Sequence, residues 1–515
     1  MDNNEKYDVI VVGAGNGGLA AATYASQNGL KTLLFEKHNL PGGAVTSFRR
    51  GRFEFEPSLH EMCEVGSRDN PGNTRLMFEE MQSDAQFVYE NSLYRVISLD
   101  PSEPFDVSLP ADFEGFYEAL EKECPGCSEK VRQFIDLEKE AIDASSKLGS
   151  KKFSLKDLPS IFNTFRMVAY SSDRVMNLLG IPKKIQHIIS PYWTYIGEPT
   201  GTVNAFMLGM MDYCYLKDGA GLPSMFSHEF SLSLDKVIRK NGGKIFYNSP
   251  VTKILIKKIN GHRTAYGVIA NGKKYYASYV VCNCFPEDVF GHMVEKRKVP
   301  LFELQKSSAR KPAFSFINVH LGLNKTIQQL GIKDYSTFIL EDADSNEQWK
   351  KCTGLGGNEW IIANALNVAI PECSVPGTTH MSITGPVIGD EWSKIPPELY
   401  KKTKLEIAER MISLYEKATG ITIKPYIEEI EVATPVTYSR YLGTPNGTPY
   451  GYQRSNWDGI FLRTMNSLKE ETVKHLHFVG AHTEESVGYN QTYKSGRRVA
   501  KRIIKEIAKE RKSNE

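Results

Sequence analysis

Three glycines in one turn, followed by an acid about twenty residues later, form the chain's most specific chemical pattern. The glycines are Gly13, Gly15 and Gly18 of the stretch GAGNGG, which also contains Asn16 and Gly17. Such glycines allow a tight turn, let a pyrophosphate approach the backbone, and let the following helix pack closely on a strand. The helix N-terminus then offers N–H groups to the phosphates, while the acid, here Glu36, accepts hydrogen bonds from a ribose. The pattern predicts a dinucleotide site.

The elements around this turn are those that such a site requires. The β-branched run YDVIVV, residues 7–12, predicts a buried parallel strand, and the alanine-rich stretch LAAATYASQNG predicts a tightly packed helix. Gly29 ends that helix, and KTLLFE predicts a second strand that Glu36 closes. The glycine-containing stretches GLGGNEW and GTPNGTPYG do not lead from a buried strand into a helix, so both are interpreted as loops. We therefore expect one dinucleotide-binding unit and no separate nicotinamide domain.

A glycine pair, Gly42 and Gly43, follows Glu36 and extends the pattern. At this point the sequence resembles the phytoene desaturase superfamily, which includes carotenoid desaturases, carotenoid cis–trans isomerases and retinol saturase. The resemblance implies that Glu36, Gly42 and Gly43 wrap the ribose and pyrophosphate of FAD, with Lys37 and Ala44 beside them.

Two further stretches resemble this superfamily. In the middle block, residues 219–286, the resemblance places Pro250 and Val251 at the adenine. In the C-terminal stretch LHFVGAHTEESVGYNQTYKSGRRVAKRI it places Gly480 and Gly488 on the glycines of the flavin motif. The helix N-terminus at Tyr489 and Asn490 would face the flavin pyrimidine ring.

The resemblance implies an α/β fold with two parts. A Rossmann-type FAD-binding domain, similar to that of glutathione reductase, would comprise residues 1–73, 217–299 and 475–515. An inserted α+β substrate domain, built on a mixed sheet, would comprise residues 74–216 and 300–474. The first insertion reads as mostly helical. The second contains AFSFINVHLGL and TTHMSIT, which predict strands, and ELYKKTKLEIAERMISLYEKATG, which predicts a helix.

Soft apolar side chains gather between residues 191 and 216. They predict a tunnel for a long hydrocarbon, because methionine and aromatic side chains adapt to a flexible apolar ligand. The alternative is ordinary helix core. The candidate substrate-binding residues are Phe206, Met207, Met210, Met211 and Tyr213.

Four residues are candidates for the chemistry. His60 in PSLHEM is placed to donate a proton or to stabilise charge beside the flavin, and a structural histidine is the alternative. Glu485 lies in the flavin-face loop, where the alternative is a solvated acid. Arg440 and Tyr441 suit a substrate carboxylate or hydroxyl, whereas a surface salt bridge is the other interpretation of the arginine.

The cysteines and histidines do not predict a metal site. No HExxH motif occurs, and neither CPGC (Cys124, Cys127) nor CNC (Cys282, Cys284) has further ligands at zinc-binding spacing. CPGC does not follow a strand, which argues against a redox motif, and CNC at a strand end is typical of buried packing.

The charge balance of the chain argues against one class of partner. Lys and Arg number 63 against 61 Asp and Glu, which argues against a nucleic-acid partner. We expect a cytoplasmic protein, because the first residues show no secretory pattern and the cysteines are sparse. The basic C-terminal helix, with Ile503, Ile504 and Ile507 on one stripe, either docks on the FAD domain or contacts an anionic membrane. The oligomeric state stays open.

The leading functional hypothesis is an FAD-dependent oxidoreductase acting on C=C or C–C bonds of a long apolar polyene or unsaturated lipid. Desaturation, saturation and flavin-mediated double-bond isomerisation remain open within it. One alternative is a flavin amine oxidase or protoporphyrinogen-type oxidase. Another, of a different class, is a non-catalytic flavin-binding carrier.

Overall fold

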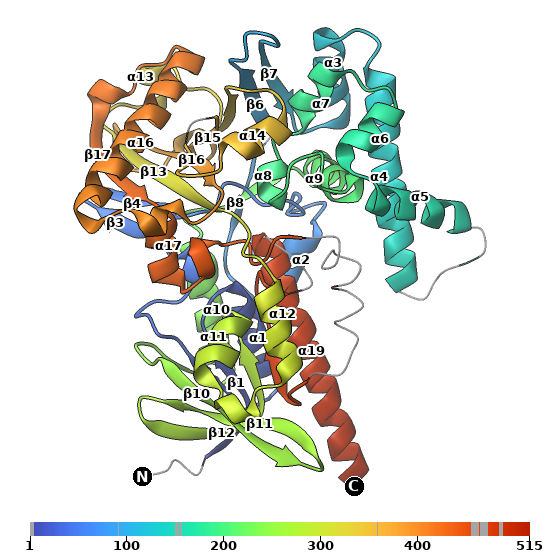
Figure 1. Cartoon of the computed structure of the whole chain (residues 1–515), viewed down its shortest axis with the longest axis vertical. Coiled ribbons are helices and arrows are strands. Elements are labelled where there is room, and N and C mark those ends of the chain that lie inside the picture. The colour runs from blue at the N-terminus through green and yellow to red at the C-terminus, as the bar shows by residue number, and fades with distance from the viewer. Residues whose placement is uncertain are drawn as a thin grey trace.

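Two seven-stranded sheets form the frame of the molecule (Figure 1). They belong to a computed structural model that describes residues 5–90, 92–149, 154, 157–357, 359–454, 463, 472–483 and 488–514. One sheet lies at the lower end of the view in Figure 1, and the other lies at the upper left with a group of helices beside it.

The lower sheet has the order β10-β11-β12-β1-β2-β9, and β18 also pairs with β12. Strands β9, β2, β1, β12 and β18 are parallel, whereas β10 and β11 form an antiparallel extension. The bounds are β1 (Lys6–Val12), β2 (Thr32–Phe35), β9 (Lys244–Phe246), β10 (Val251–Ile259), β11 (His262–Ala270), β12 (Lys273–Cys282) and β18 (Leu476–Phe478). Because the parallel strands come from three distant parts of the chain, their carboxyl ends bring those parts to one edge.

Helix α1 (Asn16–Gln27) follows β1 through the glycine turn, as predicted. A Cβ on Gly18 would lie 2.0 Å from the carbonyl oxygen of Gly13, so only glycine allows the helix to begin this close to the turn. The core on this side also takes in α2 (Asn73–Glu80), α10 (His228–Lys240) and α19 (Tyr489–Asn514).

The C-terminal helix α19 is docked on this core. Ile503 and Ile507 are buried in it, and Ile504 packs against it. The apolar stripe that a membrane contact would use is therefore occupied by the protein itself.

The upper sheet has the order β17-β13-β16-β15-β14-β6-β7 and is mixed, with β6 and β14 parallel. Its bounds are β6 (Ser92–Ser98), β7 (Phe105–Pro110), β13 (Ser315–Leu323), β14 (Ser336–Leu340), β15 (Trp360–Ala365), β16 (Thr379–Val387) and β17 (Ile427–Ala433). The predicted strands and helix of residues 313–420 are confirmed as β13, β16 and α16 (Pro397–Thr419). Strands β6 and β7, in contrast, come from the first insertion, residues 74–216, for which the sequence predicts mostly helices. The predicted fold class is confirmed.

A helical group lies beside the upper sheet, at the right of Figure 1. It consists of α3 (Phe113–Glu123), α4 (Ser128–Gly149), α5 (Leu158–Ala169), α6 (Ser172–Leu178), α7 (Lys183–Ile189), α8 (Trp193–Ile196) and α9 (Ala205–Asp218). The remaining elements include β3 (Phe48–Arg50), β4 (Phe53–Phe55), β5 (Phe87–Glu90), β8 (Ala220–Pro223), α11 (Pro286–Asp288), α12 (Leu301–Ala309), α13 (Ile327–Leu330), α14 (Ser345–Lys351), α15 (Leu366–Ala369) and α17 (Pro435–Leu442).

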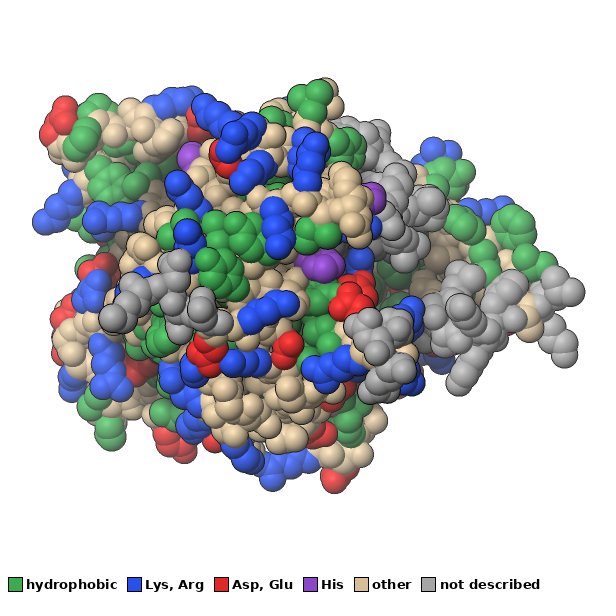
Figure 2. Space-filling model, turned by 90° about the horizontal axis from the view of Figure 1, so that it is seen from below, with side chains coloured by type: hydrophobic (Ala, Val, Ile, Leu, Met, Phe, Trp, Pro, Cys, Tyr) green, Lys and Arg blue, Asp and Glu red, His purple; other side chains and the backbone are tan. Residues whose placement is uncertain are grey.

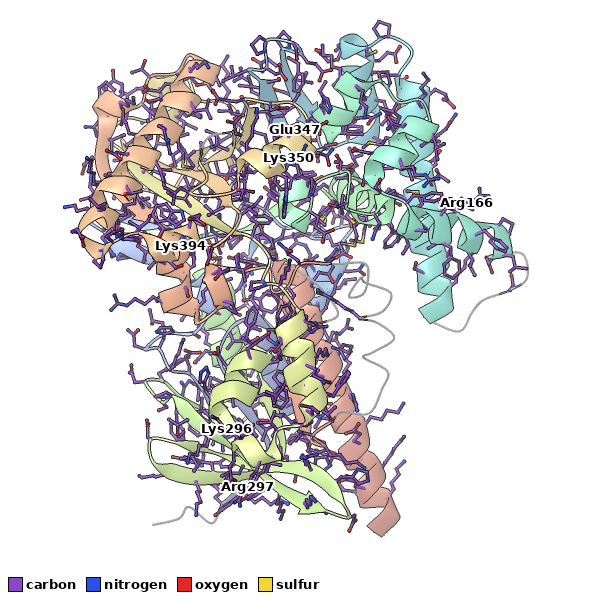
Figure 3. The ribbon with its side chains drawn as sticks, in the orientation of Figure 1. Arg166, Lys296, Arg297, Glu347, Lys350 and Lys394 are labelled. Atoms are coloured by element: carbon purple, nitrogen blue, oxygen red, sulfur yellow. The ribbon has the colours of Figure 1, made fainter. Side chains whose placement is uncertain are left out.

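Lys and Arg are interspersed with Asp and Glu over the face shown in Figure 2. Figure 3 labels other charged side chains, among them Glu347 and Lys350 of α14, which form an ion pair of 2.6 Å. Among the described residues, no helix combines the length and apolar character needed to cross a bilayer.

Candidate cofactor and substrate site

A cavity of about 560 Å³ runs from the carboxyl edge of the lower sheet to the helices α4, α8 and α9. Its volume is that of an ordinary cofactor or ligand site. Most of the predicted cofactor residues line it: Gly13, Gly15, Asn16, Gly17, Glu36, Lys37, Gly42, Gly43, Ala44, Pro250, Val251, Gly480, Gly488, Tyr489 and Asn490. Gly18 instead faces the glycine turn, where it has the packing role described above.

The glycine pair lies directly on the glycine turn. Gly42 donates a backbone hydrogen bond of 2.8 Å to Ala14, and a Cβ on Gly43 would lie 3.7 Å from the Cα of Gly15. Gly13 and Gly42 have φ values of 97° and 121°, which disfavour residues with a Cβ. The two segments together leave a wall of bare backbone, of the kind that a pyrophosphate approaches closely.

The carboxylate of Glu36 is held beneath this wall. It accepts a hydrogen bond of 2.6 Å from the backbone N–H of Ala14 and one of 2.9 Å from that of His38. Ser249, just before the predicted adenine residues Pro250 and Val251, donates its backbone N–H to the Glu36 carbonyl at 2.8 Å. The acid, the turn and the adenine segment are thus joined by hydrogen bonds to the carboxylate and the carbonyl of Glu36.

Asn283 is a site residue that the sequence did not indicate. With its amide oriented to satisfy its neighbours, the nitrogen donates to the Val479 carbonyl at 3.0 Å and the oxygen accepts from the Gly15 N–H at 3.1 Å. A Cβ on Gly15 or Gly480 would lie 2.3 or 2.6 Å from this amide. The asparagine therefore occupies the space that the glycines leave. Asn283 is the middle residue of CNC, a stretch whose recognisable pattern is the spacing of its two cysteines.

The N-terminus of α19 forms the next part of the wall. The Asn490 amide donates a hydrogen bond of 2.9 Å to Glu64, and the Lys494 ammonium lies 2.5 Å from the same carboxylate. Burial opposes ionisation of Glu64, but Lys494 outweighs it and lowers the pKa of that carboxyl. The Tyr489 hydroxyl lies 2.7 Å from that of Ser58. The predicted residue Glu485 lies outside the described residues.

His60 lies on the cavity wall between the nucleotide end and the helices. Its Nε2 is 3.1 Å from the Thr384 hydroxyl, and burial lowers the pKa of the imidazole to about 4, so the ring is neutral at pH 7. The neighbouring Glu61 also lines the cavity, and burial raises the pKa of its carboxyl to about 8. The sequence gives no local pattern that marks Glu61, because its environment comes from α8 and β14.

The helical end of the cavity is apolar. Met207, Met210 and Met211 line it together with Ile142 and Ile196, whereas Phe206 and Tyr213 lie on α9 outside the lining.

Of the two residues predicted to bind a polar group, Tyr441 lines the cavity and Arg440 does not. The Tyr441 ring stacks on His38 at 4.4 Å between centroids, beside Glu36. Tyr441 therefore lies at the nucleotide end of the cavity.

The donor set fits a flavin-type dinucleotide. Bare glycine backbone, a helix N-terminus and a buried carboxylate at a strand end supply the contacts that pyrophosphate and ribose require. The wall at α19 and at His60 would then face the ring that carries out the chemistry. Among the described residues, no cluster of His, Cys, Asp and Glu is arranged to hold a metal ion.

Comparison with known proteins agrees with this geometry. Residues 11–74 match the model of an NAD(P)-binding Rossmann-like domain. Prolycopene isomerase 2, chloroplastic, from an Oncidium hybrid cultivar is 23% identical over 530 residues, covering 100% of this chain and 86% of the relative. All-trans-retinol 13,14-reductase from Danio rerio is 24% identical over 516 residues, which cover 92% of this chain and 82% of the relative.

Among solved structures, a putrescine oxidase variant superposes with a TM-score of 0.63 at 14% identity, covering 97% of this chain and 99% of that one. That likeness shows the fold alone. The two sequence relatives extend over nearly all of the chain, and their similarity agrees with its resemblance to the superfamily of phytoene desaturases, carotenoid isomerases and retinol saturases.

Proposed function

We propose that the protein is an FAD-dependent oxidoreductase acting on the C=C or C–C bonds of a long apolar polyene or unsaturated lipid. The observation that carries the proposal is that one cavity joins two different environments. Its nucleotide end is glycine backbone with Glu36, and its other end is lined by Met207, Met210 and Met211.

FAD, when bound, supplies a flavin that accepts or returns a hydride. We propose that Glu36 and the glycines of both segments hold its ribose and pyrophosphate, that Pro250 and Val251 hold the adenine, and that the α19 N-terminus faces the flavin. The methionine-lined end would hold the substrate chain and exclude water from it. We propose that the chain is divided accordingly into two domains. Residues 1–73, 217–299 and 475–515 would form the nucleotide domain, and the rest would form the substrate domain.

The names of the two relatives favour isomerisation or saturation over desaturation. One is named for the isomerisation of prolycopene and the other for the 13,14-reduction of retinol. A redox-neutral isomerisation and a reduction both require a flavin that can be reduced, which is the property to measure first.

The test begins with the absorbance spectrum of the purified protein. It continues with anaerobic reduction and addition of carotenoids, retinoids and unsaturated fatty acids in separate samples. Turnover of one lipid class, with the new double-bond pattern read by NMR and mass spectrometry, is the expected result. Flavin reduction by amines with no lipid turnover would instead favour an amine oxidase, and bound flavin without any turnover would favour a carrier.

A further inference from the structure

The carboxyl group of Glu61 lies where the two ends of the cavity meet. On one side, Cys63 and Glu64 of the same segment contact Asn490 at the N-terminus of α19. On the other side, Tyr195 of α8 donates its hydroxyl to Glu61 at 3.1 Å, next to Ile196 at the apolar end. A substrate double bond placed between the flavin and the methionines would pass this carboxyl.

The backbone around Glu61 is fixed on both sides. Met62 exchanges two hydrogen bonds of 2.9 Å with Gly221, and the Tyr215 hydroxyl donates to the Glu61 carbonyl at 3.4 Å. The hydroxyl of Tyr335 donates to the carbonyl of His60. The carboxyl is therefore held in place rather than free to swing into solvent, as proton transfer requires.

The surroundings of the carboxyl favour its protonated form. The carboxyl accepts hydrogen bonds from the neutral hydroxyls of Tyr195 and Ser336, and the Ser336 hydroxyl, at 3.3 Å, is oriented by the Asn364 amide. Burial raises the pKa of Glu61, the charge of Glu90 adds to this, and the two hydroxyls oppose it. The other titratable groups that interact electrostatically with Glu61 are the phenols of Tyr94, Tyr192, Tyr215 and Tyr335.

The imidazole of His60, unlike the carboxyl of Glu61, favours its deprotonated form. Burial lowers the pKa of its imidazole to about 4, so at pH 7 the ring is already deprotonated. Of these two neighbours on the cavity wall, Glu61 is the one with an acidic proton to give.

We propose that Glu61 is the proton-transfer residue of this cavity, giving a proton to one carbon of the substrate double bond and taking one back in the reverse direction. The inference rests on the proposed function. In saturation, a bound reduced flavin would supply a hydride with its electron pair to one carbon and would itself be oxidised. The O–H bond of Glu61 breaks, its electrons stay on the carboxylate, and the π electrons of the double bond form the second C–H bond. In isomerisation beside the reduced flavin, the proton would add to one carbon, and after rotation the carboxylate would remove either hydrogen of that carbon, with the flavin unchanged and no net redox change.

The test uses the flavin-loaded protein with Glu61→Gln and Glu61→Asp. The matched control is Glu56→Gln, because Glu56 is an equally buried carboxyl on the same segment that bonds to Ser227 outside the cavity lining. Infrared difference spectra at pH 7 should show a protonated carboxyl band that Glu61→Gln removes. Because burial raises the pKa of Glu56 to about 7, Glu56→Gln should remove a second, weaker band and leave the Glu61 band in place. This readout does not depend on turnover.

Turnover in D2O gives the second readout. The wild type should place deuterium in the product, and Glu61→Gln should lower kcat by about 100-fold or more, with flavin content unchanged and KM changed far less. Glu61→Asp should recover part of the rate. A wild-type rate in Glu61→Gln, or no loss of a protonated carboxyl signal, would overturn the inference. Absence of any lipid turnover by the wild type would contradict the proposed function. The infrared comparison would still decide whether Glu61 carries the proton.

Discussion

Gly496 of α19 lies against the carbonyl oxygen of Gly17 at the start of α1. A Cβ at position 496 would be 2.2 Å from that oxygen and 2.8 Å from the Cβ of Ala20. The last helix of the chain therefore rests on the turn that faces the cavity, and the packing of the two helices determines the position of the glycine backbone.

Gly496→Ala should destabilise the protein and weaken flavin binding together. The added methyl group meets backbone that cannot move without moving the turn, so we expect a loss of about 1–3 kcal/mol in the free energy of unfolding. Urea unfolding and a flavin titration would measure both effects. Gly291→Ala is the matched control, because a Cβ there meets no atom within 4 Å. Unchanged flavin affinity in Gly496→Ala would separate this helix contact from the cofactor site.

Asn283→Asp should weaken flavin binding with little loss of fold. The substitution keeps the acceptor for the Gly15 N–H but places a carboxylate oxygen against the Val479 carbonyl, where the amide donates at 3.0 Å. It also brings a negative charge to the wall that would face a pyrophosphate. We expect a rise of about 10-fold or more in the flavin Kd, because the new carboxylate would repel the pyrophosphate and the hydrogen bond to Val479 would be lost, which contributes about 0.5–1.5 kcal/mol. Flavin binding of wild-type strength in this variant would contradict the role given to Asn283.

The sequence predicts well those features that depend on local pattern. The turn Gly13–Gly18, the acid Glu36 and the pair at Gly42 act through backbone conformation and spacing, so their positions along the chain carry most of the information. The strands β13 and β16 and the helix α16 were likewise predictable, because their apolar residues recur with the period of the element.

Features that depend on distant partners were not predictable in the same way. Asn283 acquires its role from Gly15 and Val479, and Glu61 acquires its raised pKa from burial between α8 and β14. Helical periodicity on α9 could not tell Met207, which lines the cavity, from Phe206, which does not. In each case the deciding contact joins segments far apart in the chain.

Met210→Trp should impair substrate binding and leave the cofactor in place. Met210 lines the apolar end, and the larger ring would fill space that a long chain needs. We expect kcat/KM for a long polyene to fall by about 10-fold or more, with an unchanged flavin spectrum and less effect on a short substrate. Tyr213→Phe on the same helix is the control, because Tyr213 lies outside the cavity lining. Equal losses in both variants would indicate a general defect of α9.

Glu61 should make the protein less stable as the pH rises. The fold raises the pKa of this carboxyl from 4.5 to about 8, so between these values the folded state binds one proton more than the unfolded chain. The free energy of unfolding then falls with pH, by at most about 1.4 kcal/mol per pH unit from this group. Below pH 4.5 both states are protonated and above pH 8 both are ionised, so the contribution to the slope vanishes outside the window.

Urea unfolding at pH 5, 6, 7 and 8 would compare the wild type with Glu61→Gln, which cannot ionise. The stability of the wild type relative to the variant should decrease steadily across this range and then level off. Glu56, whose pKa burial raises to about 7, is present in both proteins, so its contribution of the same sign cancels in the difference. Parallel stability curves would mean that Glu61 is ionised throughout the window, and the carboxyl would then have no proton to give at neutral pH.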